Sequence, residues 1–136
     1  PFELASTFRN RHLFTHGFIN KVTTNATRPQ TIGLFDFVAN TLKIKPHDVL
    51  IVKMDIEGYE YDTLEYFVEN GGNTLLDELM LEIHYNHPRM KKLFNWCRFP
   101  KDDYVRNQNW CKYSFRDAIN LFKRLRDSGI YTHFWP

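Results

Sequence analysis

Four side chains that could bind a ligand or accept a proton follow two apolar segments of the chain. Asp55 and Glu57 stand at the end of the first segment, and Glu82 and His84 stand at the end of the second. Alternate residues of a β-strand share a face, so each pair would project from one face of its strand. Ligands of open α/β sheets bind outside the carboxyl ends of the strands. If the two strands are neighbours, the four side chains converge on one edge of the sheet.

Carboxylates and an imidazole at such an edge suit acid–base chemistry. Two carboxylates there need a functional reason, and a histidine at the carboxyl end of a strand suits a general base. We therefore take Asp55, Glu82 and His84 as catalytic candidates. For Glu57 we favour a structural role, in which it accepts backbone N–H groups at the start of the following helix. For Lys53 we expect an ion pair with Glu82 or Asp55.

The same carboxylates and imidazole could also hold a divalent metal. A metal-dependent hydrolase is therefore one alternative function, and it would use Asp55, Glu57, Glu82 and His84. No tight motif with two histidines accompanies these residues, so the sequence does not favour a metal.

A helix and a strand are expected to precede the first pair of side chains. Apolar residues recur at helical spacing over 32–43, and Pro46 ends this predicted helix. The segment 49–56 is a short, nearly continuous apolar run, typical of a strand buried on both faces of a parallel sheet. Upstream of these elements we expect only a strand near 17–22.

Helices and strands alternate through the rest of the chain. Helical spacing over 61–68, ended by Gly71-Gly72, leads to a second strand at 78–85, which completes a βαβ unit. Ser114 and Asp117 predict a capping box at the start of a last helix, and a final strand follows at 130–135. The buried stripe of that helix is expected to consist of Phe115, Ala118, Ile119, Phe122 and Leu125. The fold class is therefore α/β with a mostly parallel sheet. Three strands are few for such a sheet, so either the N-terminal segment adds more strands or the chain is the second half of a larger fold.

A long irregular segment, 85–113, separates the second strand from the last helix. It holds seven basic against two acidic residues, and it also holds seven aromatic residues. Interleaved aromatics and cations suit a sugar ring, an acidic glycan or a nucleotide. The alternative is that the aromatic rings simply cover the core. The substrate-binding candidates are Tyr85, His87, Arg89 and Trp96.

Length and composition limit the remaining possibilities. The chain has 136 residues, which fits a single domain over 1–136, and its net charge of +2 is too small to predict nucleic-acid binding. No apolar run approaches the roughly 20 residues of a membrane span. The chain begins with Pro1, so we expect an upstream piece to be missing. Cys97 and Cys111 leave a disulfide and two free thiols equally open.

Two motifs carry a resemblance to a known family. The run Val52 to Glu60, VKMDIEGYE, resembles the K-[IM]-D-[IV]-E-G-x-E signature of FkbM-type S-adenosylmethionine-dependent methyltransferases. The run Leu76 to Asn86 resembles the DE-[LI]-x-LE-x-HYN pattern of a plant methyltransferase-like branch. That branch also has counterparts of segments 121–129 and 133–135. The resemblance covers about residues 31–136.

This resemblance implies a Rossmann-like methyltransferase sheet, of which the chain would be the C-terminal half. It places Asp55 near the methyl donor, and we take Asp55 and Glu57 as cofactor-binding candidates for S-adenosylmethionine. Such enzymes need a glycine-rich first turn, but the sequence holds no G-x-G. We expect that turn to lie upstream of Pro1, so that the fragment alone is inactive. The alternative is a degenerate relative that no longer methylates.

The expected function is methyl transfer to an oxygen of a glycan or small metabolite. Asp55 or His84 would take the proton of the acceptor, and the segment 85–113 would hold it. A non-catalytic module that binds a glycan or a protein is a second alternative. The plant-like relatives look like secretory-pathway proteins, anchored in the Golgi membrane through an N-terminal segment, and the sequon at Asn25 is compatible with this location. A cytoplasmic location is the alternative.

Overall fold

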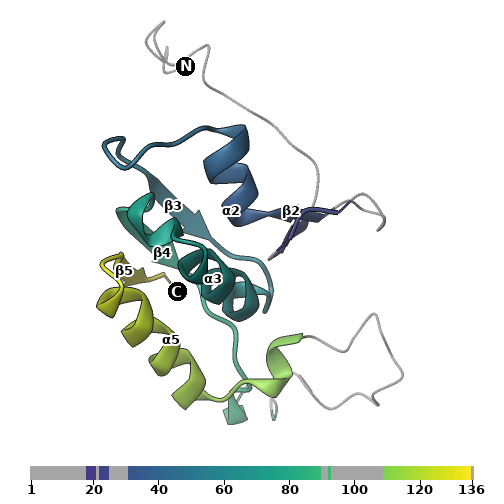
Figure 1. The fold of residues 1–136 in the computed structure, drawn as a ribbon. Coiled ribbons are helices and arrows are strands. Elements are labelled where there is room, and N and C mark those ends of the chain that lie inside the picture. Colours follow the sequence, from purple (N-terminus) through teal and green to yellow (C-terminus); the bar gives the residue numbers. More distant parts are fainter. Residues whose placement is uncertain (1–17, 21, 25–30, 90–91, 93–108, 136) are drawn as a thin grey trace, which may run out of the picture.

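The computed structural model describes residues 18–20, 22–24, 31–89, 92 and 109–135. Within them, two parallel sheets form a mixed α/β fold (Figure 1). The smaller sheet pairs β1 (Phe18–Asn20) with β2 (Thr31–Gly33). The larger has the order β3-β4-β5, with strands Ile51–Met54, Glu78–Leu81 and Tyr131–Phe134. The predicted α/β class and parallel sheet are confirmed.

The βαβ unit brings the two predicted ligand-bearing segments together. Helix α3 (Glu60–Glu69) connects β3 to β4, and the register pairs Met54 with Leu81. Asp55 and Glu82 therefore leave the sheet side by side, and the N–H of Glu82 donates to the carbonyl of Met54 at 3.0 Å. Both strands are shorter than predicted, since the paired residues end at Met54 and Leu81.

The described helices pack on one face of the larger sheet. Helices α3 and α5 (Phe115–Asp127) lie on the same side of it (Figure 1), and Leu79 and Leu81 of β4 are fully buried beneath them. The prediction that the first strand is buried on both faces is wrong for the described part of the chain. Ile51 is 55% exposed, because no described helix covers the second face and β3 is an edge strand here.

The first predicted helix, 32–43, starts later and has an irregular second half. Thr31–Gly33 pairs with β1 instead, so the helix begins as α2 (Leu34–Asp36) and continues as the π-helical turn η1 (Phe37–Thr41). The N–H of Leu42 donates to the carbonyl of Phe37 at 2.8 Å, which is the i to i+5 spacing of a π-turn. Strand pairing thus overrides the helical periodicity of its first residues.

Helix α5 has the predicted capping box but a different buried stripe. The N–H of Ser114 donates to Asp117 Oδ2 at 2.6 Å, and the N–H of Asp117 donates to Ser114 Oγ at 3.3 Å. The buried residues are Ala118, Leu121 and Leu125. Two members of the predicted stripe, Phe115 and Ile119, are instead 59% and 52% exposed. The helix is rotated so that Leu121 faces the core.

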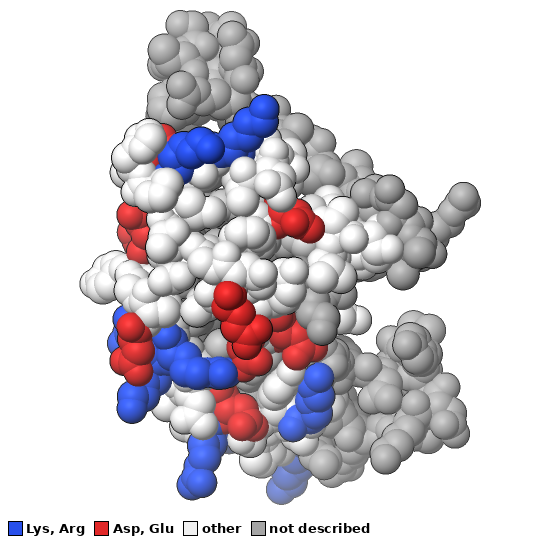
Figure 2. All heavy atoms as spheres, in the orientation of Figure 1, with Lys and Arg blue, Asp and Glu red and all other residues white. Residues whose placement is uncertain are grey.

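Basic and acidic side chains are intermixed over the lower half of the face drawn in Figure 2.

Among the described helices, none has the length and apolar character that a membrane crossing requires.

Candidate functional site

The turn between β3 and α3 is folded around the carboxylate of Glu60. Its Oε1 accepts hydrogen bonds from the N–H groups of Ile56 at 3.2 Å and Gly58 at 3.0 Å. The turn contains two residues with positive φ, Glu57 at 53° and Gly58 at 94°. Glycine adopts such a conformation readily and glutamate rarely does. The spacing D-x-E-G-x-E therefore makes structural sense, because its last glutamate closes the turn that presents the first two carboxylates.

Glu60 also holds the imidazole of His84. His84 Nδ1 lies 3.0 Å from Glu60 Oε1, and because a carboxylate only accepts, Nδ1 carries the donated proton. Glu60 is fully buried and the His84 side chain is 14% exposed. This bond fixes the orientation of the ring and turns its Nε2 toward the edge of the sheet.

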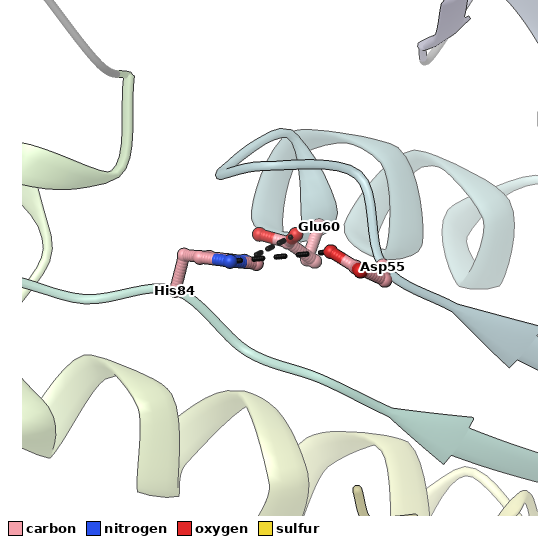
Figure 3. A group of neighbouring side chains, drawn as sticks. All are labelled: Asp55, Glu60 and His84. Atoms are coloured by element: carbon pink, nitrogen blue, oxygen red, sulfur yellow. Dashed lines mark hydrogen bonds and ion pairs between the residues drawn. The ribbon is translucent and has the colours of Figure 1, made fainter. Parts of the chain in front are cut away.

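Three further carboxylates surround His84 Nε2. The nearest oxygens of Glu57, Asp55 and Glu82 lie 3.4, 3.9 and 4.0 Å from it. Figure 3 shows Asp55, Glu60 and His84 pointing toward one another, Asp55 and His84 from the segments that follow β3 and β4 and Glu60 from the start of α3. The predicted convergence of Asp55, Glu57, Glu82 and His84 at one edge is confirmed, and we call these four residues with Glu60 the edge cluster.

The electrostatics of the edge cluster favour a positive charge on the imidazole. Burial lowers the pKa of His84, but the hydrogen bond and charge of Glu60 together with the charges of Glu57 and Asp55 outweigh it, so that the pKa lies above its usual value. The cluster is thus a place where a cation is stabilised.

Two structural roles expected from the sequence are wrong. Backbone N–H groups at the start of α3 bind Glu60, whereas the carboxylate of Glu57 faces His84. Lys53 forms no ion pair among the described residues, since its ammonium lies over the ring of Trp135, 4.7 Å from the centroid.

Glu60 is the site residue that sequence reasoning missed. Helical periodicity could have identified Glu60, because its position falls on the buried side of the helix with Tyr61 and Leu64. A glutamate in the first turn of an amphipathic helix normally faces solvent. A carboxylate on the apolar side of a helix needs a partner, and His84 with the backbone of the turn supplies one.

The substrate-binding candidates lie beside the cluster or outside the described residues. Tyr85 follows His84 directly and its ring lies 5.5 Å from that of Phe115. The ring of His87 accepts the N–H of the exposed Arg89 at 3.2 Å. Trp96 and Cys97 lie outside the described residues.

An open, mainly apolar pocket of about 560 Å³ lies between the segment that follows β4 and helix α5. Ile83 and Tyr85, which flank His84, form one wall, and α5 and the end of β5 form the other. Lys123, Arg126 and Asp127 place charges at this pocket. Its volume falls in the range of small-molecule sites.

The segment directly before α5 is anchored on the first turn of α3. The rings of Tyr113 and Tyr61 stack with their centroids 3.5 Å apart, and Tyr113 donates its hydroxyl to Asp62 at 3.0 Å. The N–H of Asn86 donates to the carbonyl of Tyr113 at 2.8 Å. Cys111, in the same segment, is disulfide-bonded. Both ends of the segment 85–113 are therefore held close to the edge cluster.

Comparison with known proteins identifies the family that this fold and site represent. The FkbM methyltransferase domain matches residues 2–127, nearly the whole chain, and the chain belongs to this family. The predicted family is confirmed, and the match begins well upstream of residue 31, where the resemblance in the sequence begins. No curated protein and no solved structure matches the chain.

Proposed function

We propose that the chain carries the acceptor-binding side of an S-adenosylmethionine-dependent methyltransferase that methylates an oxygen of a glycan or small metabolite. The edge cluster is the observation that carries this proposal. Its carboxylates and imidazole lie at the carboxyl edge of a parallel sheet, where ligands of α/β folds bind.

The charge of the edge suits the cofactor. S-adenosylmethionine, when bound, supplies an electrophilic methyl group on a positively charged sulfur. Asp55 and Glu57 are 44% and 75% exposed, so two carboxylates at this edge are open to a cationic ligand. This arrangement supports Asp55 and Glu57 as cofactor-binding candidates.

The edge cluster also suits the removal of a proton. As the acceptor oxygen forms its bond to the methyl carbon and the carbon–sulfur bond breaks, the acceptor hydroxyl loses a proton. Asp55, Glu82 and His84 lie together at this edge, and the Glu60–His84 hydrogen bond keeps the imidazole in place, which supports these three residues as candidates for the proton acceptor.

The pocket against α5 is the proposed place of the acceptor. Tyr85 forms part of its wall, and the ring offers an apolar face to a sugar or an aromatic metabolite. His87 and Arg89 follow at the start of the segment 85–113 and could contact polar groups of the same acceptor.

We further propose that the protein works in the secretory pathway. The disulfide of Cys111 supports this location, since such bonds persist in oxidising compartments and are rare in the cytosol. The sequon at Asn25 is compatible with it. A glycosidase-sensitive mass shift of the cellular protein would support the proposal, and a reduced, unglycosylated protein would favour the cytoplasm.

Calorimetric titration with S-adenosylhomocysteine tests the proposed activity. The titration compares this chain with the same chain extended by its upstream residues, and it includes the variant Asp55→Asn. We expect the extended chain to bind and Asp55→Asn to lose methyl transfer at unchanged folding. Absence of binding by both chains would refute the methyltransferase and favour a non-catalytic module that binds a glycan or protein.

A further inference from the structure

We propose that the edge cluster binds one divalent metal ion of intermediate hardness, of which Mn²⁺ is the representative. Asp55, Glu60 and His84 supply the central donors, and Glu57 and Glu82 complete the set. The binding of the ion is independent of the proposed function. Only its use rests on that function, as a cation that attracts an oxygen of the acceptor.

The geometry of the cluster fits a shared ion. One donor atom each of Asp55, Glu60 and His84 lies within 4.8 Å of the others. The oxygens of Glu57 and Glu82 lie 3.4 and 4.0 Å from His84 Nε2. Metal–ligand bonds of roughly 2.0–2.6 Å place the donors of one ion about 3–5 Å apart. The observed separations therefore need only small side-chain rotations to accommodate an ion.

The charge of the cluster is not balanced by basic side chains. Four carboxylates surround a single imidazole, and within the described part of the chain His84 is the only basic partner of all four. The nearest lysine along the strand, Lys53, lies over Trp135 instead. With the neutral imidazole that a metal ligand requires, the cluster carries a charge of −4, half of which a divalent ion would compensate.

A buried oxygen of Glu60 is the second, independent indication of a ligand. Glu60 is fully buried, and its Oε2 has no hydrogen-bond partner, whereas Oε1 has three. Figure 3 shows the carboxylate pointing toward His84 and Asp55. Buried carboxylates are normally paired or coordinate a metal, and an ion between these side chains would supply the missing partner.

The donor types select the class of ion. One imidazole with several carboxylates is harder than the nitrogen- and sulfur-rich sites of zinc, and it contains a nitrogen that Ca²⁺ and Mg²⁺ sites rarely use. Mn²⁺ accepts both donor types, and its electron spin makes the ligands directly observable.

The chain offers a matched control on the same sheet. His133 of β5 and Glu78 of β4 form another histidine–carboxylate pair, with Nε2 and Oε1 3.0 Å apart. The additional carboxylates of the edge cluster have no counterpart around this second pair among the described residues. Glu78→Gln should therefore leave metal binding unchanged.

The experiment titrates chelator-treated protein with Mn²⁺ alone and follows the free ion by electron paramagnetic resonance. We expect one site, about ten-fold or more weaker binding in Asp55→Asn and Glu82→Gln, and less than about two-fold change in Glu78→Gln. Pulsed resonance should detect an imidazole nitrogen on the ion, and His84→Gln should remove that signal. Circular dichroism of each variant verifies its fold, and the exposed Asp55 provides a variant with little risk of unfolding.

Three outcomes would overturn the metal site. They are no Mn²⁺ binding by the folded protein, equal losses in Asp55→Asn and Glu78→Gln, and a bound ion without nitrogen coupling. S-adenosylhomocysteine is titrated separately. Binding of Mn²⁺ without the nucleoside would support the metal site and refute the methyltransferase, whereas the reverse result would overturn the metal site alone.

Discussion

Tyr113 lies flat against Tyr61, with the ring planes inclined by only 15°, and thereby joins the segment before α5 to the first turn of α3. Tyr61 follows Glu60, the residue that closes the β3–α3 turn, and the carbonyl of Tyr113 accepts the N–H of Asn86, two residues beyond His84. The aromatic stack thus supports the edge cluster from the side of the substrate-binding candidates.

The Tyr113→Phe variant should change the alkaline stability of the protein. Burial, followed by the hydrogen bond to Asp62, raises the pKa of Tyr113 above its ordinary value. A raised folded-state pKa contributes stability that is complete below the unfolded value of about 10 and is lost as the pH rises above it. At neutral pH, loss of the hydrogen bond from the Tyr113 hydroxyl to Asp62 should lower the free energy of unfolding of Tyr113→Phe by about 1 kcal/mol. It should also lose less stability between pH 9 and about 11 than the wild type.

Urea unfolding monitored over this pH range provides the measurement. Tyr131→Phe is the control, because it makes the same substitution at an exposed side chain. An unchanged pH profile in Tyr113→Phe would show that the stack does not shield the hydroxyl.

Glu60→Gln should loosen the β3–α3 turn. The amide keeps the size of the side chain but loses the charge that attracts the N–H groups of Ile56 and Gly58 and the imidazole of His84. Loss of charge-assisted bonds in a buried site should lower the free energy of unfolding by about 1–3 kcal/mol. Hydrogen exchange of the Gly58 amide should become faster, and equal protection in both proteins would contradict the role assigned to Glu60.

Leu121→Ala should be more damaging than Ile119→Ala. Leu121 is fully buried between α5 and the sheet, whereas Ile119 is half exposed. A buried leucine truncated to alanine costs about 2–5 kcal/mol, while Ile119→Ala should cost less than about 1 kcal/mol. Thermal unfolding of the two variants measures the difference. A larger destabilisation by Ile119→Ala than by Leu121→Ala would contradict the observed burial and support the buried stripe expected from the sequence.

Ser114→Ala should alter the acid end of the stability profile. Hydrogen bonds from the Ser114 side chain and backbone lower the pKa of Asp117. A lowered folded-state pKa contributes stability that is present above the unfolded value of about 4 and is lost as the pH falls through the folded value. Ser114→Ala should therefore have a lower free energy of unfolding at neutral pH, and this free energy should fall less steeply below about pH 4 than in the wild type. Unfolding monitored by circular dichroism over this pH range provides the measurement.

The sequence predicts the elements of this fold better than the way in which they bury their side chains. The βαβ unit and the convergence of Asp55, Glu82 and His84 follow from strand alternation and parallel pairing, which are local rules. The orientation of α5 does not follow, because Leu121 and Ile119 are equally apolar and only packing against α3 and the sheet decides between them. Similarly, the sequence allows Lys53 to contact either a carboxylate or an aromatic ring, and only the position of Trp135 after β5 shows that it contacts the ring.

Glu60 marks the same limit within the site. The sequence shows its motif position but not that one carboxylate closes a turn and holds an imidazole that is 24 residues away. Helical periodicity places Glu60 on the buried side of α3, but its partner depends on the three-dimensional approach of two elements.

The positive φ of Glu57 has a consequence for protein engineering. Glycine at this position would relieve a conformation that glutamate rarely adopts, so Glu57→Gly is a candidate for a more stable chain. The same change would remove the most exposed carboxylate of the edge cluster. Stability and activity are therefore expected to be in opposition at residue 57, and a search for thermostable variants that also selects for activity should retain the glutamate.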